Sequence, residues 1–348
     1  MNKKKSSLKY SKSSSFYQSS MSDLFKKNQS YLKKTEMLNE LYSSQPKRKK
    51  CKICEEPLPK SVDFHSHNVD YVFCASCTHL NGVFDDTESF IEQVYTNDIS
   101  SFYSGHYMKK NFVQRTKDIY IPKVDFLFSI LPPNPMKYEI LDVGCGGGHF
   151  VFASILKNIS ASGFDLNENI IEFGNKQIFH NCEQSPLLCV DEDSFFQKVK
   201  STTSDVVSAI GVIEHFREPH KFFEAFKLSK AKYLYYSVPM FSLSVVLENV
   251  FKNVYPRQLS ADHTHLFTEK SICKMHDLIG VSSIGEWRFG TDVMDMYRHL
   301  LINLQSNNSS QKMIDYMNEG FGSKIDDIQS ILDTNHFSSE IHVVASKT

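Results

Sequence analysis

A glycine-rich turn and a later aspartate have the residue types and the spacing of a nucleotide-binding site. The apolar run 138–143 passes directly into the glycine-rich segment 144–148, and another apolar segment follows. This order predicts a strand, a tight turn and a helix. Glycine allows turn conformations closed to other residues, and the unpaired N–H groups at a helix start favour a negatively charged ligand. The next strand-like run ends at Asp165, 23 residues after Asp142, which is close to the spacing at which a carboxylate meets ribose hydroxyls.

The turn itself departs from the dinucleotide-binding fingerprint. It reads Gly144-x-Gly146-x-Gly148, whereas the fingerprint is Gly-x-Gly-x-x-Gly. With Leu-Asp-Val-Gly-Cys-Gly-Gly-Gly at 141–148, the chain resembles the class I S-adenosylmethionine-dependent methyltransferases. The resemblance implies that this motif holds the methionine end of the cofactor and that Asp165 takes the ribose hydroxyls. The set of cofactor-binding residues implied in this way is Asp142, Gly144, Cys145, Gly146, Gly148, Asp165, Leu166, Asp191, Glu192 and Gly211.

The resemblance places the adenine near the end of the third strand. Asp191 is the candidate acceptor for the adenine amino group, with Glu192 and Asp193 as rivals. An alternative interpretation is that these acidic residues begin a helix, where they complement its dipole.

Two histidine-containing stretches are candidates for the transfer chemistry. Residues 211–219, Gly-Val-Ile-Glu-His-Phe-Arg-Glu-Pro, resemble a Glu-His-x-x-x-Pro signature of small-molecule methyltransferases. Some quinone O-methyltransferases of this group bind a divalent metal through Glu-x-x-Glu-His, but Gly211 stands at the first position here, so no such site is predicted. His215 is expected either to line the pocket or, together with Glu214, to tie the loop down.

The second stretch, Asp-His-Thr-His-Leu-Phe-Thr at 262–268, resembles an element that follows the fifth strand in many methyltransferases of cell-surface sugars. Transfer to a hydroxyl requires an in-line donor and acceptor and removal of a proton, for which the near-neutral pKa of histidine is suited. We predict His265 as the base, followed by His263 and then His215; holding backbone carbonyls is the alternative role. The preceding insertion is predicted to form a lid, and Arg257 is a candidate partner for a phosphate or carboxylate.

Four cysteines have the spacing of a zinc ribbon. Cys51-x-x-Cys54 is followed after 19 residues by Cys74-x-x-Cys77. Four thiolates complete a tetrahedron around Zn²⁺ and leave no open position, so the predicted metal is structural. A segment this short has little core of its own, and metal binding supplies the missing free energy. We expect the nearby His65, His67 and His79 to lie at the surface.

Composition sets the class and the compartment. The chain has 348 residues, 41% hydrophobic, with a formal net charge of −1. Residues 1–60 contain 15 Lys and Arg against 5 Asp and Glu, or +10, which favours either a solvated lead-in or contact with nucleic acid. No secretory signal or membrane span is expected, and the scattered cysteines suit a reducing compartment, so a cytoplasmic protein is predicted.

The order of the predicted elements indicates an α/β fold with a seven-stranded doubly wound sheet, of the Rossmann-like methyltransferase type. Strands are expected at 139–143, 161–165, 187–190, 205–210, 233–238, 281–289 and 340–345. The resemblance implies that the last strand inserts antiparallel. The expected organisation is a disordered tail 1–20, an N-terminal helix 21–46 with Ser22 as its candidate N-cap, a zinc ribbon 47–80, a linker and helical cap 81–136, and a methyltransferase domain 137–348 with a lid at 239–262. Tyr103, His106 and Tyr107 in the cap are candidates for shaping the acceptor pocket.

These features predict S-adenosylmethionine-dependent methylation of a small molecule, with a sugar or nucleotide-sugar of a surface polysaccharide as the favoured acceptor. A cysteine ribbon before this fold resembles nucleotide-sugar C-methyltransferases, but their further C-terminal domain has no counterpart here, which favours O-methylation. An RNA base methyltransferase and a non-catalytic cofactor-binding protein are the alternatives. The N-terminal helix is expected to dock on the body or to pair two subunits as a homodimer.

Overall fold

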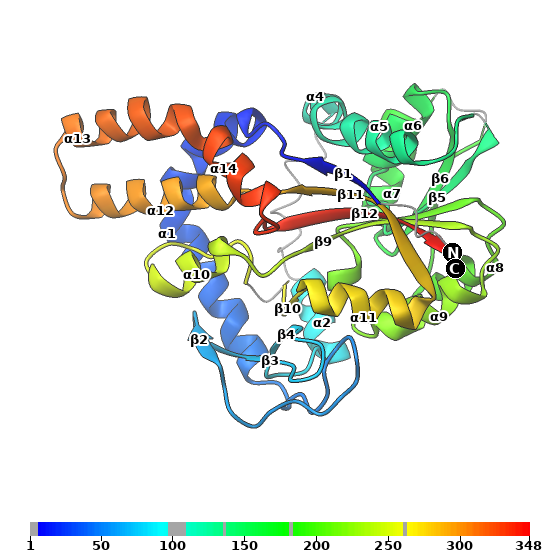
Figure 1. Ribbon diagram of the computed structural model, residues 1–348, viewed down its shortest axis with the longest axis horizontal. Helices are drawn as coiled ribbons and strands as arrows, with labels where there is room; N and C mark the ends of the chain where they lie inside the picture. The colour runs from blue at the N-terminus through cyan, green and yellow to red at the C-terminus, as the bar shows by residue number, and fades with distance from the viewer. Residues whose placement is uncertain (1–5, 97–108, 135–136, 181–183, 260–262) are drawn as a thin grey trace.

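A large mixed sheet forms the centre of the protein. The computed structural model describes residues 6–96, 109–134, 137–180, 184–259 and 263–348. The sheet has eight strands in the order β1-β11-β12-β9-β8-β5-β6-β7 (Figure 1). Their bounds are β1 Ser7–Tyr10, β5 Glu139–Val143, β6 Ser160–Asp165, β7 Leu187–Cys189, β8 Val206–Ile210, β9 Tyr233–Pro239, β11 Val281–Phe289 and β12 Glu340–Lys347.

Pairing within the sheet confirms the predicted α/β class. Strands β5 to β9 pair in parallel with one another, as expected for strands separated by helical crossovers. Strand β12 lies antiparallel between β9 and β11, which is the predicted late insertion. The parallel strands are short and rich in β-branched and aliphatic residues because both of their faces are buried.

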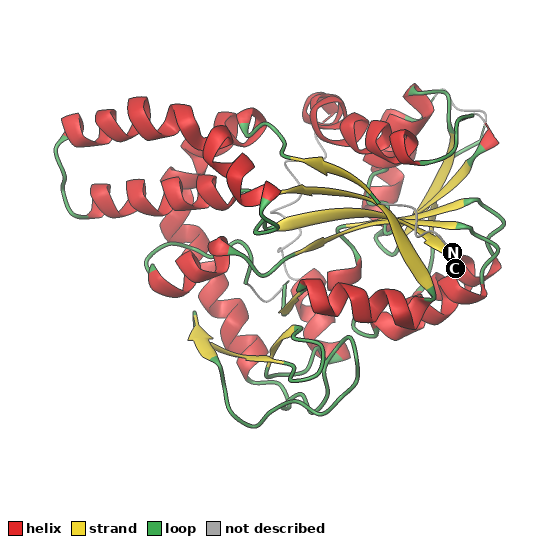
Figure 2. Ribbon diagram, viewed as in Figure 1, coloured by secondary structure: helices red, strands yellow, loops and turns green. Residues whose placement is uncertain are grey.

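Helices cover both faces of the sheet and make a three-layer fold (Figure 2). In Figure 1, α4, α5 and α6 lie on one side and α8, α9 and α11 on the other. Three helices precede β5: α2 Glu88–Thr96, α4 Lys109–Arg115 and α5 Ile121–Ile130. The helices between the later strands are α6 His149–Leu156, α7 Glu168–Phe173, α8 Glu192–Ser201, α9 Pro219–Leu228 and α11 Glu269–Ile279. π-helical turns continue α4 and α7, at Thr116–Tyr120 and Gly174–Ile178, and a 3₁₀ turn at Ile213–His215 lies between β8 and α9.

The N-terminal segment was expected to be disordered, and this expectation is wrong for residues 7–10. Strand β1 pairs in parallel with β11, from Ser7 opposite Gly285 to Tyr10 opposite Arg288. The indole Nε1 of Trp287 donates a hydrogen bond of 2.9 Å to the carbonyl of Ser11. An otherwise polar segment is ordered here because the edge of the sheet offers it unpaired backbone groups.

A smaller, four-stranded sheet holds the cysteine segment, in the order β10-β4-β3-β2. Three strands come from the predicted ribbon: β2 Phe64–Ser66, β3 Val69–Phe73 and β4 Leu80–Gly82. The fourth, β10 His265–Leu266, comes from the chain after β9 and pairs antiparallel with β4. The ribbon and the large domain therefore share a sheet, an arrangement that no local sequence pattern indicates.

The long helix α1, Ser15–Ser43, docks along the body. It begins seven residues before the predicted start at Ser22. The amide of Asn28 donates to the carbonyl of Asn253, and that of Asn39 donates to the carbonyl of His67. The helix thus contacts both the ribbon and the segment after residue 250. Of the two roles expected for this helix, docking on the body is the one observed.

The predicted lid region contains helix α10, Leu243–Val250. It packs against α12, Asp292–Ser306, beside the further C-terminal elements α13 Gln311–Tyr316, Met317–Phe321, Gly322–Lys324 and α14 Ile325–Thr334. The buried carboxylate of Glu248 accepts backbone N–H groups of residues 257–259, which fixes the returning loop. Within the described residues, no helix combines the length and the apolar character that a bilayer crossing requires.

Candidate functional site

The glycine turn after β5 has the backbone that the sequence predicts. Gly144, Gly146 and Gly148 all have positive φ, at 63°, 52° and 84°. At Gly144 a Cβ atom would lie 2.9 Å from a methyl of Val212, so glycine is required there for space as well as for conformation. The turn leads into α6 and brings backbone N–H groups to the carboxyl end of β5, where ligands of such sheets bind.

Asp165 closes this turn from the neighbouring strand β6. Its Oδ2 accepts the N–H of Gly146 at 2.9 Å, and its Oδ1 accepts the N–H of Asn167 at 2.9 Å. The side chain is half-buried. Each carboxylate oxygen has further acceptor capacity, so the same group is suited to receive hydroxyl donors.

Asp142, at the end of β5, is almost fully buried. The hydroxyl of Ser208 donates to its Oδ1 at 2.6 Å. Burial raises the pKa of Asp142 to about 7, with a smaller contribution from the charge of Asp165, while the Ser208 hydrogen bond and the charge of Lys123 oppose the rise. Because the carboxyl group lies at the base of the turn, a cationic ligand there would meet a group that ionises near neutrality.

The residues implied for the adenine and ribose lie at the ends of β6 and β7. Leu166 is 47% exposed, an apolar surface beside the turn. The thiol of Cys145 is buried, and burial holds its pKa well above the usual range, so it is an inert packing group. Asp191 caps α8, accepting the Ser194 N–H at 2.8 Å, and Glu192 is exposed in the first helical turn. The helix-start alternative is therefore realised at Asp191, whose carboxylate is partly engaged by its own helix.

The turn after β8 buries a carboxyl group. Gly211, with φ 68°, starts this turn, and Glu214 is only 5% exposed. Burial raises the pKa of Glu214 to about 8. Its Oε2 has no hydrogen-bond partner among the described residues. His215 and His263 lie beside it, with their ring centroids 5.0 Å apart, so two of the three predicted histidines are brought together here.

His265 occupies a different environment. It is 1% exposed and lies in β10, where its Nδ1 and the Nε2 of His79 share a hydrogen bond of 2.8 Å. His79 also bonds Ser271 at 3.2 Å. Burial holds the pKa of both imidazoles well below the usual value. The expectation that His79 and His67 lie at the surface is wrong, because both are buried where the ribbon meets the body, whereas His65 is exposed.

A cavity of about 180 Å³ opens beyond the carboxyl end of β9. His263 and Arg257 reach it, but His265 does not line it. Its lining is mostly polar: Ser237, Val238, Pro239, Arg257, Gln258, His263, Thr291, Ser339 and Glu340. The guanidinium of Arg257 donates to Asp295 at 3.0 Å, so its charge is partly neutralised within the protein.

Sequence reasoning missed Lys123, a buried lysine in α5. Its charge acts on Asp142, Glu214 and Glu340, which places it electrostatically among the site carboxylates. Burial lowers the pKa of Lys123 to about 8. Its helix was predicted, but a lysine in a helix carries no signal that it faces inward. Tyr103, His106, Tyr107 and Asp262 lie outside the described residues.

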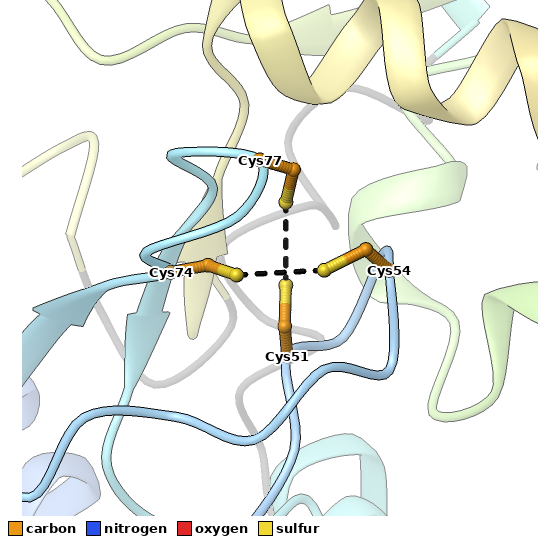
Figure 3. Close-up of side chains that lie close together, drawn as sticks. All are labelled: Cys51, Cys54, Cys74 and Cys77. Carbon is orange, nitrogen blue, oxygen red and sulfur yellow. Dashed lines mark hydrogen bonds between the residues drawn. The ribbon is translucent and has the colours of Figure 1, made fainter.

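The four cysteines converge in the ribbon (Figure 3). The Sγ atoms of Cys51 and Cys77 are 3.6 Å apart, and those of Cys54 and Cys74 are 3.4 Å apart. These distances are far beyond the roughly 2.05 Å of a disulfide. They approach the separation of about 3.8 Å that a tetrahedral ion with Zn–S bonds of about 2.3 Å imposes. The donor set and its burial therefore fit a closed four-thiolate metal site.

The part of the chain that holds the glycine turn and Asp165 also matches a known family model. A family model described as a methyltransferase domain matches residues 112–281. No curated protein matches the chain. Among solved structures, a magnesium protoporphyrin IX methyltransferase from Synechocystis PCC 6803 with bound S-adenosylhomocysteine is 13% identical, with a TM-score of 0.49, over 75% of this chain and 100% of that one.

Two further structures give similar values. A SAM-dependent methyltransferase from Archaeoglobus fulgidus is 16% identical, with a TM-score of 0.40, over 73% of this chain and 100% of that one. A plantazolicin methyltransferase in complex with a triazolic desmethylPZN analog and S-adenosylhomocysteine is 15% identical, with a TM-score of 0.44, over 74% of this chain and 94% of that one. The sheet order, the glycine turn and the family match together support a methyltransferase domain that includes residues 112–281.

Proposed function

We propose that this protein transfers a methyl group from S-adenosylmethionine to a hydroxyl of a small polar acceptor, with a sugar or nucleotide-sugar as the favoured class. The observation that carries the proposal is the glycine turn closed by Asp165, which forms a cofactor cradle at the carboxyl end of the sheet. The methionine end is assigned to Asp142 and the turn, and the ribose to Asp165 and Leu166.

In the proposed reaction the cofactor supplies the methyl group, and the residues of the cavity bind the acceptor and take its proton. The acceptor hydroxyl loses its proton, its oxygen attacks the methyl carbon, and the carbon–sulfur bond breaks as the carbon–oxygen bond forms, leaving a neutral thioether. The enzyme's own task is to align the two reactants and to receive the proton. His263 is the preferred proton acceptor because it lines the cavity, with His215 beside it. His265 is hydrogen-bonded to His79, so we give it the role of holding β10, and with it the neighbouring His263, in place.

The cavity supports a small polar acceptor. Most of its lining residues carry hydrogen-bonding side chains. Its volume of about 180 Å³ is below the ~300–1,000 Å³ of sites for drug-sized ligands. A monosaccharide, or one sugar unit of a larger molecule, satisfies both conditions.

We also propose that the ribbon binds one structural Zn²⁺ through Cys51, Cys54, Cys74 and Cys77. The amide of Asn81 donates to the Cys51 Sγ at 3.7 Å, and hydrogen bonds of this kind stabilise a coordinated thiolate. The metal would stabilise β4, the strand with which β10 pairs. It would therefore also help to fix the segment between His263 and α11.

The first test is calorimetric titration with S-adenosylhomocysteine. Micromolar binding by the wild type and its loss in Asp165→Ala are expected, with Asp327→Ala, at an exposed aspartate of α14, as the matched control. Wild-type protein that is folded and does not bind would refute the proposal. Binding without turnover on any sugar acceptor would favour the non-catalytic alternative.

The RNA alternative rests on the basic N-terminal region, but some of its positive side chains interact with other groups of the protein. Arg48 and Lys52 both pair with the buried Asp86. Lys9 lies 3.7 Å from the ring centroid of Trp287. An RNA-binding face should give an affinity that falls steeply with salt, and a titration at two salt concentrations distinguishes this alternative.

A further inference from the structure

Three side chains from two distant segments converge next to the acceptor cavity. Glu214 and His215 follow β8, and His263 precedes β10. One potential ligand atom from each lies within 4.8 Å of the other two. The sequence alone argued against a metal here, because Gly211 stands where the Glu-x-x-Glu-His pattern has its first carboxylate. The fold supplies a different third side chain, His263, from about 50 residues further along the chain.

Two of these side chains have polar atoms that the protein leaves unsatisfied. Glu214 is 5% exposed, and neither its Oε2 nor the Nδ1 of His263 finds a hydrogen-bond partner in the described parts of the chain. An unsatisfied buried polar group costs about 1–3 kcal/mol, and more when it is charged. Such groups in a native site point to a missing ligand.

The donor set and its spacing identify the class of that ligand. One carboxylate and two imidazoles are the protein ligands of open catalytic metal sites, whereas four thiolates make closed structural ones. Bond lengths of about 2.0–2.2 Å to nitrogen and oxygen place ligand atoms of a tetrahedral ion about 3.4 Å apart. The three ligand atoms are all within 4.8 Å of one another. Small rotations of these side chains would bring the atoms to the separation that a bound ion requires.

We propose that Glu214, His215 and His263 bind a divalent transition-metal cation and leave its remaining positions open to the acceptor. This inference rests on the proposed methyl transfer and specifies its acceptor as one that presents a hydroxyl, or two neighbouring oxygens, to the cation. A hydroxyl bound to a divalent cation is more acidic, so its proton is released to solvent before the oxygen attacks the methyl carbon. On this proposal His263 is a ligand of the cation, and this role replaces that of proton acceptor given to it under the proposed function.

The test uses Co²⁺ as the probe on the full chain, without cofactor or acceptor. Weakly held metals are first removed with a chelator, and the metal in the ribbon is quantified. Cobalt on cysteine thiolates gives intense sulfur-to-metal absorption, whereas cobalt on imidazole and carboxylate gives only weak visible bands, so the two sites are distinguished in one spectrum. The wild type should bind one equivalent with the weak bands alone.

Removing a ligand should weaken this binding by more than the ~10–100-fold typical of outer-shell changes. Glu214→Gln and His263→Ala are the two test variants, and His263, in a half-buried loop, tolerates change if the buried Glu214 does not. His65→Ala, an exposed histidine, is the matched control and should bind as the wild type does.

The outcomes separate the two proposals. Absence of the weak bands in wild-type protein, or equal cobalt affinity in wild type and both variants, overturns the cation site. Titration of the same samples with S-adenosylhomocysteine reads the cofactor site independently, so a failure of the proposed function appears as lost cofactor binding whatever the cobalt result.

Discussion

Cofactor affinity should depend on pH through Asp142. Burial raises the pKa of this carboxyl group to about 7 from 3.8. In the proposed site, the ammonium group at the methionine end of the cofactor would pair only with the ionised form. A group with that pKa is ionised in about one molecule in eleven at pH 6 and in about ten in eleven at pH 8. The apparent affinity for S-adenosylhomocysteine should therefore rise about tenfold over this range, or ~1.4 kcal/mol.

Calorimetry in two buffers of different ionisation enthalpy measures the proton directly. Binding should release about 0.9 proton at pH 6 and about 0.1 at pH 8. In Asp142→Asn the affinity should be lower and the proton release should disappear. In Ser208→Ala the rise should move to higher pH, because the hydroxyl that lowers the pKa of Asp142 is lost. Wild-type binding with no proton release at pH 6, or release that persists in Asp142→Asn, would refute the reasoning.

The same carboxyl group should make the free energy of unfolding of the cofactor-free protein depend on pH. Its pKa is higher in the folded chain than in the unfolded chain, so its contribution is fully present below about pH 3.8 and is lost as the pH rises through about 7. Relative to Asp142→Asn, the free energy of unfolding of the wild type should fall by about 3 kcal/mol between pH 5 and pH 8. Urea unfolding at both pH values tests this value.

Three further predictions concern the turn, the ribbon and the sheet edge. Gly144→Ala should lower the unfolding midpoint and weaken S-adenosylhomocysteine binding, because φ of 63° costs an L-residue about 1–2 kcal/mol and the new Cβ meets Val212 at 2.9 Å. Cys54→Ser should remove one equivalent of zinc, measured by elemental analysis, and lower the melting temperature. Deletion of residues 1–11 should shift the fluorescence of Trp287 to longer wavelength, because the strand that covers this single tryptophan is lost.

Each of these has a matched control. Gly320→Ala meets no atom within 4 Å and should leave stability and binding unchanged. Cys273→Ser, at an exposed thiol, should keep the zinc. Ser11→Ala retains the backbone carbonyl that accepts from the indole, so the emission should not move. A control that behaves as its test variant does would contradict the assigned cause.

The strands and the cofactor turn could be predicted because their signals are local. Strand 281–289 is observed at the predicted bounds, and 139–143 likewise, because apolar runs end at turn-forming residues. The glycines at 144, 146 and 148 adopt positive φ, a conformation that costs glycine little free energy because it has no Cβ atom. Here the physical cause lies within a few residues of its effect.

The remaining features depend on contacts between distant segments. His265 has the sequence context of a catalytic base, but pairing of β10 with β4 buries it against His79. Strand β1 is only four residues long, lies in a Lys/Ser-rich segment, and is ordered by a sheet edge nearly 280 residues away. Asp191 was a candidate for adenine, yet its own helix start competes for its carboxylate. Tertiary pairing of this kind leaves no trace in local composition.

The sharing of one sheet by β10 and the cysteine ribbon bears on how the protein can be recombined. The cut that a domain diagram suggests, after residue 80, would fall inside β4 and would separate the first residue of that strand from its partner β10. A chimera that exchanges the ribbon between homologues must carry residues 263–271 with it, so that His265 and Ser271 arrive with His79. The interchangeable unit is therefore discontinuous in sequence, and both pieces have to be exchanged together.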